Sequence, residues 1–112
     1  MIYKMEEPGA EVELYELEQM PGELIGKAVI DSKARMVGIV RNVKITLPTF
    51  KVEIVIKGFD VEIPVDIQNV DTVGSVVKLK IQMDTIETVE IEDIIRLRKE
   101  LNEEIRERLQ MR

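Results

Sequence analysis

Apolar and polar residues alternate with a period of two through most of residues 23–83, and this pattern predicts short β-strands. The segment RMVGIVRNVKI (35–45) places Val37, Ile39, Val43 and Ile45 on one parity, so we expect one apolar strand face. Gly26 and Gly38 lie inside such segments, where glycine is typical of a bulge or a sharp bend. A further alternating segment, SVVKLKIQM (75–83), directs these side chains inward: Val77, Leu79, Ile81 and Met83.

The clearest local pattern is a β-hairpin in FKVEIVIKGFDVEIPVD (50–66). Glycine at the first central position of a two-residue turn is typical of type II′, so Gly58-Phe59 predicts the turn. The register that follows pairs apolar with apolar residues and lysine with aspartate. It places Pro64 opposite Glu53 on the outer side and predicts these pairs: Ile56 with Val61, Ile54 with Ile63, Val52 with Val65, Lys57 with Asp60, and Lys51 with Asp66.

The C-terminal segment changes from strand to helix character. VEIEDIIRLRKELNEEIRERLQMR (89–112) has no glycine or proline, is rich in strong helix formers, and carries acids at its start and arginines at its end. We therefore expect a helix from about residue 89 to about residue 110. At 100° per residue its apolar side chains form one broad stripe: Ile91, Ile94, Ile95, Leu97, Leu101, Ile105 and Leu109.

This apolar stripe has two interpretations. It packs on the chain's own strands, or it contacts another chain. A helix of this length spans roughly 30 Å and would overhang a 60-residue barrel. Arg98 and Asn102 lie in the middle of the stripe, and a partner interface uses such polar residues to fix register. We therefore predict a self-association or partner-docking face, with a homodimer as the expected assembly, formed by Ile94, Leu97, Arg98, Leu101, Asn102, Ile105 and Leu109.

The organisation that we expect is an N-terminal arm (1–22), a β-domain (23–84) and a C-terminal helix (85–112). Pro8-Gly9 and Pro21-Gly22 interrupt the first segment, while alternation over Glu11 to Leu14 indicates a short strand. The segment is either a mobile arm or an acidic-apolar stretch that lies along its own β-domain or along a partner.

Composition excludes several classes of function. The 112 residues suit one domain, and a net charge of −6 argues against nucleic acid and anionic membranes as partners. The sequence has neither a signal-peptide pattern nor an apolar run of membrane-spanning length, so we expect a cytoplasmic protein. Abundant glutamate, lysine, arginine and isoleucine are typical of thermophiles.

Candidate chemistry is sparse. With no histidine or cysteine, the chain lacks the usual base and thiolate ligands, and Ser32 and Ser75 both lie in predicted turns. No phosphate-binding glycine loop and no EF-hand pattern occurs. We expect no catalytic residue, no metal site and no cofactor.

Two motifs resemble the PRC-barrel family. The segment LIGKAVIDSKARMVGIVRNV is similar to its opening, and VEIPVDIQNVDTVGSVVKLK to its closing part. Ala34 stands where the family usually has glycine, and Asn42 where it often has aspartate. The residues that carry the resemblance are Leu24, Gly26, Val29, Asp31, Val37, Gly38, Val40, Ile63, Pro64, Val65, Val73, Gly74, Val76, Val77 and Leu79.

The resemblance implies a mainly β fold, a small PRC-like barrel of five to six antiparallel strands followed by the helix. It also implies a non-enzymatic platform for protein binding. Small stand-alone archaeal members act as cell-division adaptors that bind homologous barrels and a membrane-tethering partner of the division ring. The alternative is a ribosome-assembly or maturation factor that binds a ribosomal protein through the barrel, against which the acidic charge counts.

Overall fold

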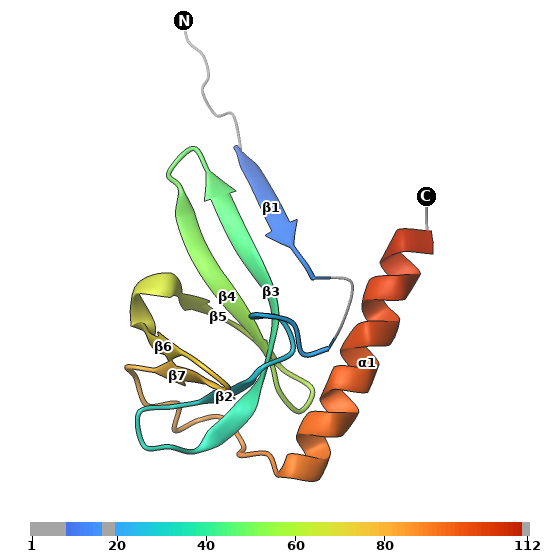
Figure 1. The fold of residues 1–112 in the computed structure, drawn as a ribbon. Helices are drawn as coiled ribbons and strands as arrows, with labels where there is room; N and C mark the ends of the chain where they lie inside the picture. The colour runs from blue at the N-terminus through green and yellow to red at the C-terminus, as the bar shows by residue number, and fades with distance from the viewer. Residues whose placement is uncertain (1–8, 17–19, 111–112) are drawn as a thin grey trace, which may run out of the picture.

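The computed structural model describes residues 9–16 and 20–110, with side chains as far as Arg108, and consists of a β-sheet with one long helix (Figure 1). The helix, α1 (Ile91–Gln110), lies where the sequence predicts it, so the mainly β fold with a C-terminal helix is confirmed. A short 3-10 helix, η1 (Ile67–Asn69), links two of the strands. The strands are β1 (Ala10–Leu14), β2 (Ala28–Ile30), β3 (Met36–Leu47), β4 (Lys51–Lys57), β5 (Glu62–Asp66), β6 (Val70–Val73) and β7 (Val77–Leu79).

The strands form one open, mixed sheet, which corrects the predicted closed barrel of five to six antiparallel strands. The seven strands follow the order β5-β4-β3-β2-β7-β6, with β1 paired to the C-terminal half of β3. Strands β2 and β7 pair in parallel. The two ends of this order, β5 and β6, are joined by η1 and do not pair with each other.

The link between β2 and β3 is a turn built on Asp31, whose side chain is fully buried. Its carboxylate accepts hydrogen bonds from the backbone N–H groups of Lys33, Arg35 and Met83 and from the guanidinium of Arg35. Burial alone raises the pKa of Asp31, but these hydrogen bonds lower it by more, to about 2. In the same turn Ala34 donates its N–H to the Asp31 backbone carbonyl (2.9 Å) and has a φ of 62°, a left-handed conformation that costs less for glycine than for other residues.

Strand β3 bends at two irregularities in its pairing. The register with β2 shifts beside Gly38, whose φ is 155° and where a Cβ would collide with the Lys57 carbonyl. The register with β4 shifts at Arg41, which is the extra residue between Val40 and Asn42. This second bulge reverses the facing of the strand, so Ile39 and Val43 lie on opposite faces. The single apolar parity predicted across these positions is therefore wrong.

The β4–β5 hairpin has its predicted faces but not its predicted register. Ile54 lies opposite Val65 and Ile56 opposite Ile63, so each pair is two residues from the expected one. The loop contains four residues, closed by a hydrogen bond from Gly58 N–H to the Val61 carbonyl (3.0 Å). Aspartate, which tolerates positive φ, supplies the left-handed residue instead of glycine, with Asp60 at 51°. The other pairs become Lys57 with Glu62, Glu53 with Asp66, and Val55 with Pro64.

The predicted strand at 75–83 is shorter than expected. Strand β7 ends at Leu79, although the buried positions of Val77, Leu79 and Met83 agree with the predicted inward parity. Ile81 is half-buried, and the sequence pattern did not separate β6 from its neighbours. Strand β1 contains the short strand that alternation over Glu11 to Leu14 indicates, whereas β6 was not predicted as a separate strand.

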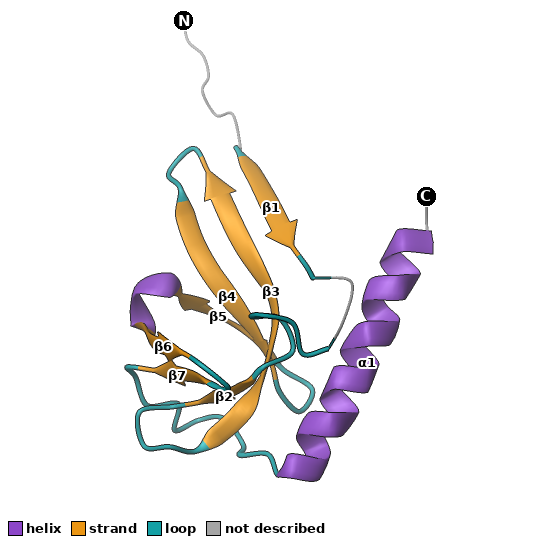
Figure 2. Ribbon diagram, in the orientation of Figure 1, coloured by secondary structure: helices purple, strands orange, loops and turns teal. Residues whose placement is uncertain are grey.

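Aliphatic side chains build most of the core, in which the helix takes part. Ile54, Ile56 and Val40 are buried on one face of the sheet, and the helix lies along the other face, where Lys57 reaches Glu104 (3.2 Å). Figure 2 shows the helix running beside the sheet as far as the level of β1. The most deeply buried core residues are Ile39, Ile54, Ile56, Leu79, Leu101, Val29, Val37, Val40 and Val77.

Candidate functional site

Most of the predicted docking face of the helix is buried in the chain's own core. Ile94, Leu97, Leu101 and Ile105 are all buried and belong to the single hydrophobic cluster. A partner cannot reach these four side chains in this fold, so the self-packing interpretation holds for them. The helix does not overhang, because Arg108 reaches Glu13 of β1 (3.9 Å).

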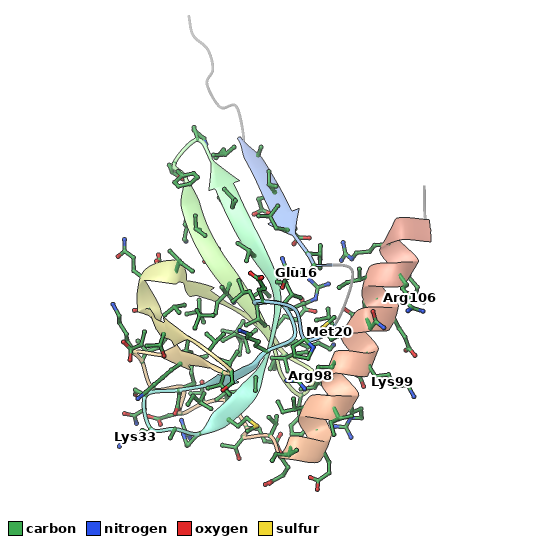
Figure 3. All side chains as sticks on the ribbon, in the orientation of Figure 1. Glu16, Met20, Lys33, Arg98, Lys99 and Arg106 are labelled. Atoms are coloured by element: carbon green, nitrogen blue, oxygen red, sulfur yellow. The ribbon has the colours of Figure 1, made fainter. Side chains whose placement is uncertain are left out.

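The two polar residues of the predicted face are half-buried between helix and sheet. Arg98 donates from Nε to the Gly26 carbonyl (2.7 Å), so it fastens the helix to the turn before β2. Asn102 lines a shallow hollow of about 370 Å³ with Met20, Ile95 and Arg98. Figure 3 shows Met20 and Arg98 beside the sheet-facing side of the helix, whereas Lys99 and Arg106 point away. The side chain of Leu109 lies outside the described residues.

The N-terminal half of the helix leaves some apolar surface uncovered. Ile91 is 67% exposed and Ile95 62% exposed, so the outer edge of the predicted stripe meets water. These two side chains lie one turn apart and form a narrow strip. Two isolated side chains of this kind are normal on a protein surface and do not define a binding site by themselves.

A charged cluster joins the middle of the helix to the sheet. Arg41 is buried and its Nε lies 3.1 Å from a carboxylate oxygen of Glu62 and 3.5 Å from one of Glu104. Its Nη1 donates to the Tyr15 hydroxyl (3.0 Å), and its guanidinium lies over the Tyr15 ring. Burial raises the pKa of Tyr15, although the charge of Arg41 acts in the opposite direction. These contacts join β3, β5, the helix and the segment after β1, so the cluster acts as a structural clamp.

Glu16 fixes the segment that follows β1. Its carboxylate accepts hydrogen bonds from the backbone N–H groups of Glu23 (3.0 Å), Leu24 (2.9 Å) and Ile25 (2.6 Å). Partial burial alone raises the pKa of Glu16, but these hydrogen bonds lower it by more. The contact ties residues 15–16 to the turn before β2 and so positions β1 against β3. Of the predicted N-terminal arm, residues 10–14 form a strand, while residues 1–8 and 17–19 lie outside the described residues.

A three-stranded arm extends from the sheet and carries four of the nine exposed large apolar side chains among the described residues. It consists of β1, Val43–Leu47 of β3 and the start of β4, which rise together in Figure 1. Cross-strand pairs put apolar side chains on one face: Val12 beside Ile45 and Ile45 beside Val52. We define the arm face as these residues, with Phe50 at the tip: Val12, Leu14, Val43, Ile45, Leu47, Phe50 and Val52.

The arm face is open to solvent at its outer positions. The exposed fractions are 40% for Val12, 49% for Leu14, 38% for Leu47 and 68% for Phe50. At ordinary residue areas these fractions amount to less than about 400 Å² of exposed residue surface in total. Contiguous patches of this size on soluble proteins are commonly interaction sites.

The opposite face of the arm is charged. Lys44 and Lys51 both approach Glu53 (3.8 and 3.6 Å), and Arg108 approaches Glu13. Along every strand of the arm, apolar side chains therefore point to one face and polar or charged side chains to the other. The sequence contained this signal: Val43, Ile45 and Leu47 continue the alternation beyond the length that a small core needs, and sequence reasoning missed it by treating the strand as core throughout.

A second hollow and the two serines lie elsewhere on the described surface. A hollow of about 410 Å³ between the β4–β5 loop and the helix is lined by paired or stacked side chains, among them Phe59, over which Arg96 lies, and Glu100. Ser32 and Ser75 are exposed in turn or bend positions. Among the described residues no group of three or more acidic, histidine or cysteine side chains is placed to hold a metal ion.

No protein-family model and no curated protein matches this sequence. Among the helices of the described residues, none has both the length and the apolar character needed to cross a bilayer.

Proposed function

We propose that this chain is a non-enzymatic protein-interaction module whose contact surface is the arm face. The observation that carries the proposal is the solvent-exposed apolar surface formed by Val12, Leu14, Leu47 and Phe50. These side chains lie outside the core cluster, so their exposure does not serve the fold. Leaving several large apolar side chains in water costs about 1.5–3 kcal/mol each relative to burial, which a partner recovers.

The helix has a supporting role in this proposal. It completes the core and clamps the sheet through Arg41, Lys57 and Glu104, so the arm projects from a rigid base. The surface offered to a partner is then preformed, which reduces the entropy lost on binding. The cell-division adaptor role and the binding of homologous barrels stay predictions carried by the PRC-barrel resemblance alone.

Site-specific photo-crosslinking in a native lysate tests the proposal. A photoreactive residue at Phe50 should give a protein adduct of defined mass, whereas the same residue at Lys33, exposed in the β2–β3 turn, should give none. Leu47→Lys in the Phe50-labelled chain should abolish the adduct, because it places a charge in the arm face. Equal adducts from both positions, or no adduct from Phe50, would contradict the proposal.

A further inference from the structure

Strand β1 offers an unsatisfied edge on the side of the arm away from β3. Among the described residues it pairs with β3 alone, and all five of its residues are exposed. An edge strand presents a row of unpaired N–H and C=O groups, which an extended peptide can satisfy by adding a strand. We propose that the β1 edge binds an extended segment in which apolar residues alternate with lysine or arginine; this inference rests on the function proposed above.

The two faces of β1 set the pattern that the added strand needs. Val12 lies opposite Ile45, so it belongs to the arm face, whereas Glu13 lies opposite Lys44 on the charged face. Side chains that are directly opposite or adjacent on the same face interact. The added strand therefore places apolar side chains beside Val12 and Leu14 and its alternate side chains beside Glu11 and Glu13.

A second copy of β1 does not fit this edge. If two copies of β1 pair in antiparallel fashion with their arm faces on the same side, each even-numbered residue lies opposite an even-numbered one and each odd-numbered residue opposite an odd-numbered one. Every such register that pairs three or more residues of β1 puts Glu11 or Glu13 of one copy opposite Glu11 or Glu13 of the other. Like charges directly opposite destabilise a strand pair, so these acids discriminate against self-pairing. A basic strand converts each repulsion into an attraction.

Glu11 is the acid that gains most from a basic partner. Glu13 already has Arg108 at 3.9 Å, while no described side chain forms an ion pair with Glu11. The net charge of −6 favours approach of a basic segment over long range. Charge therefore selects the partner strand and main-chain hydrogen bonds hold it.

The area of the arm face also favours strand addition. A stable protein interface buries about 800 Å² on each partner. The arm face supplies less than half of that, so contact through side chains alone is insufficient. Backbone pairing along Ala10–Leu14 adds the missing interactions and extends the arm face by another strand.

Titration of the full chain with synthetic peptides tests the inference. The probe is a fluorescent seven-residue peptide of alternating lysine and valine, and its binding is followed by anisotropy at low salt. The matched control peptide alternates glutamate and valine, and a third peptide has the lysine–valine sequence with an N-methyl group on every backbone nitrogen. We expect saturable binding of the first peptide alone, because N-methylation removes the backbone donors of the peptide and glutamate reverses its charge.

Protein variants separate local recognition from general charge attraction. Glu11→Lys should weaken binding by about fivefold or more, because reversal of the charge turns an attraction into a repulsion. Glu87→Lys changes the net charge equally at an exposed position in the loop before the helix and should change binding less than twofold. Both positions are exposed, so both variants should melt like the wild type.

Three results would overturn the inference: no binding of the lysine–valine peptide, equal weakening by both variants, or full binding of the N-methylated peptide. A wild-type dimer with β1 amides protected from exchange would assign the edge to a second copy and overturn it as well. An adduct from Phe50 that persists when the peptide fails to bind would leave the interaction function intact. Loss of that adduct would remove the function itself.

Discussion

Replacement of Asp31 by asparagine should destabilise the chain by about 2 kcal/mol at pH 7. The carboxylate is fully buried and holds the β2–β3 turn together. Its pKa falls from 3.8 to about 2 on folding, and this difference corresponds to about 2 kcal/mol at 1.36 kcal/mol for each tenfold change in proton affinity. In Asp31→Asn the side chain loses its negative charge. Its NH₂ group also faces backbone N–H groups and the Arg35 guanidinium, which are donors themselves and cannot accept a hydrogen bond from it.

The stabilisation by Asp31 depends on pH and decreases as the pH falls. Because the folded pKa is depressed, the stabilisation is present above pH ~4–5, falls to about half near pH 3 and is nearly lost at pH ~2. The difference in unfolding free energy between wild type and Asp31→Asn, measured by urea denaturation from pH 7 to pH 3, should therefore shrink as pH falls. Asp84→Asn is the matched control, because Asp84 pairs with the same arginine but is exposed, and it should change stability by less than about 0.5 kcal/mol. A difference that stays constant with pH, or an asparagine variant as stable as wild type, would refute the reasoning.

Two further substitutions test the helix packing and the strained turn. Leu101→Ala, at a fully buried helix position, should cost about 3 kcal/mol in urea denaturation, whereas Ile95→Ala, on the exposed side, should cost less than about 0.5 kcal/mol; equal losses would contradict the packing. Ala34→Gly should stabilise the chain by about 0.5 kcal/mol, because glycine removes the backbone strain at φ 62°. The gain is small because glycine also raises the conformational entropy of the unfolded chain, which opposes folding. A lower melting temperature for this variant would show that Ala34 is not strained.

The sequence predicts which residues form strands better than it predicts how the strands pair. Alternation identified both faces of the β4–β5 hairpin, but the register depends on loop length. Asp60, and not glycine, supplies the left-handed residue, so a four-residue loop replaced the expected two-residue turn. Apolar residues repeat every two positions, and a shift of two residues therefore leaves the pattern unchanged.

Alternation also fails where the chain inserts one residue. Arg41 occupies a bulge, so apolar positions on either side of it face opposite directions although they share a parity. Sheet closure has a similar limit, because it depends on pairing between distant strands and no local pattern records that β5 and β6 stay apart. By contrast, the helix needs only local signals, and its bounds agree with prediction to within two residues at the start.

The apolar stripe of the helix shows the limit of the sequence pattern, because such a stripe does not identify what covers it. Periodicity found the apolar side chains of the helix, but whether the sheet or another chain buries them is a tertiary property. Arg98 supported the partner interpretation as a polar residue within the stripe, and its actual role is to bind the Gly26 carbonyl. The arm face was visible as an alternation that continues past the core, yet its exposure follows only from the open end of the sheet.

Residue-resolved hydrogen exchange of the full chain tests most directly the claim that the helix belongs to the core while the arm edge stays free. The account predicts that the amides of Leu97, Leu101 and Ile105 exchange only by global unfolding, with the same opening free energy as Ile54 and Ile56. The amides of β1 that do not bond to β3 should exchange orders of magnitude faster. Helix amides that open well before the β3–β4 core, or an edge of β1 protected as fully as that core, would contradict it.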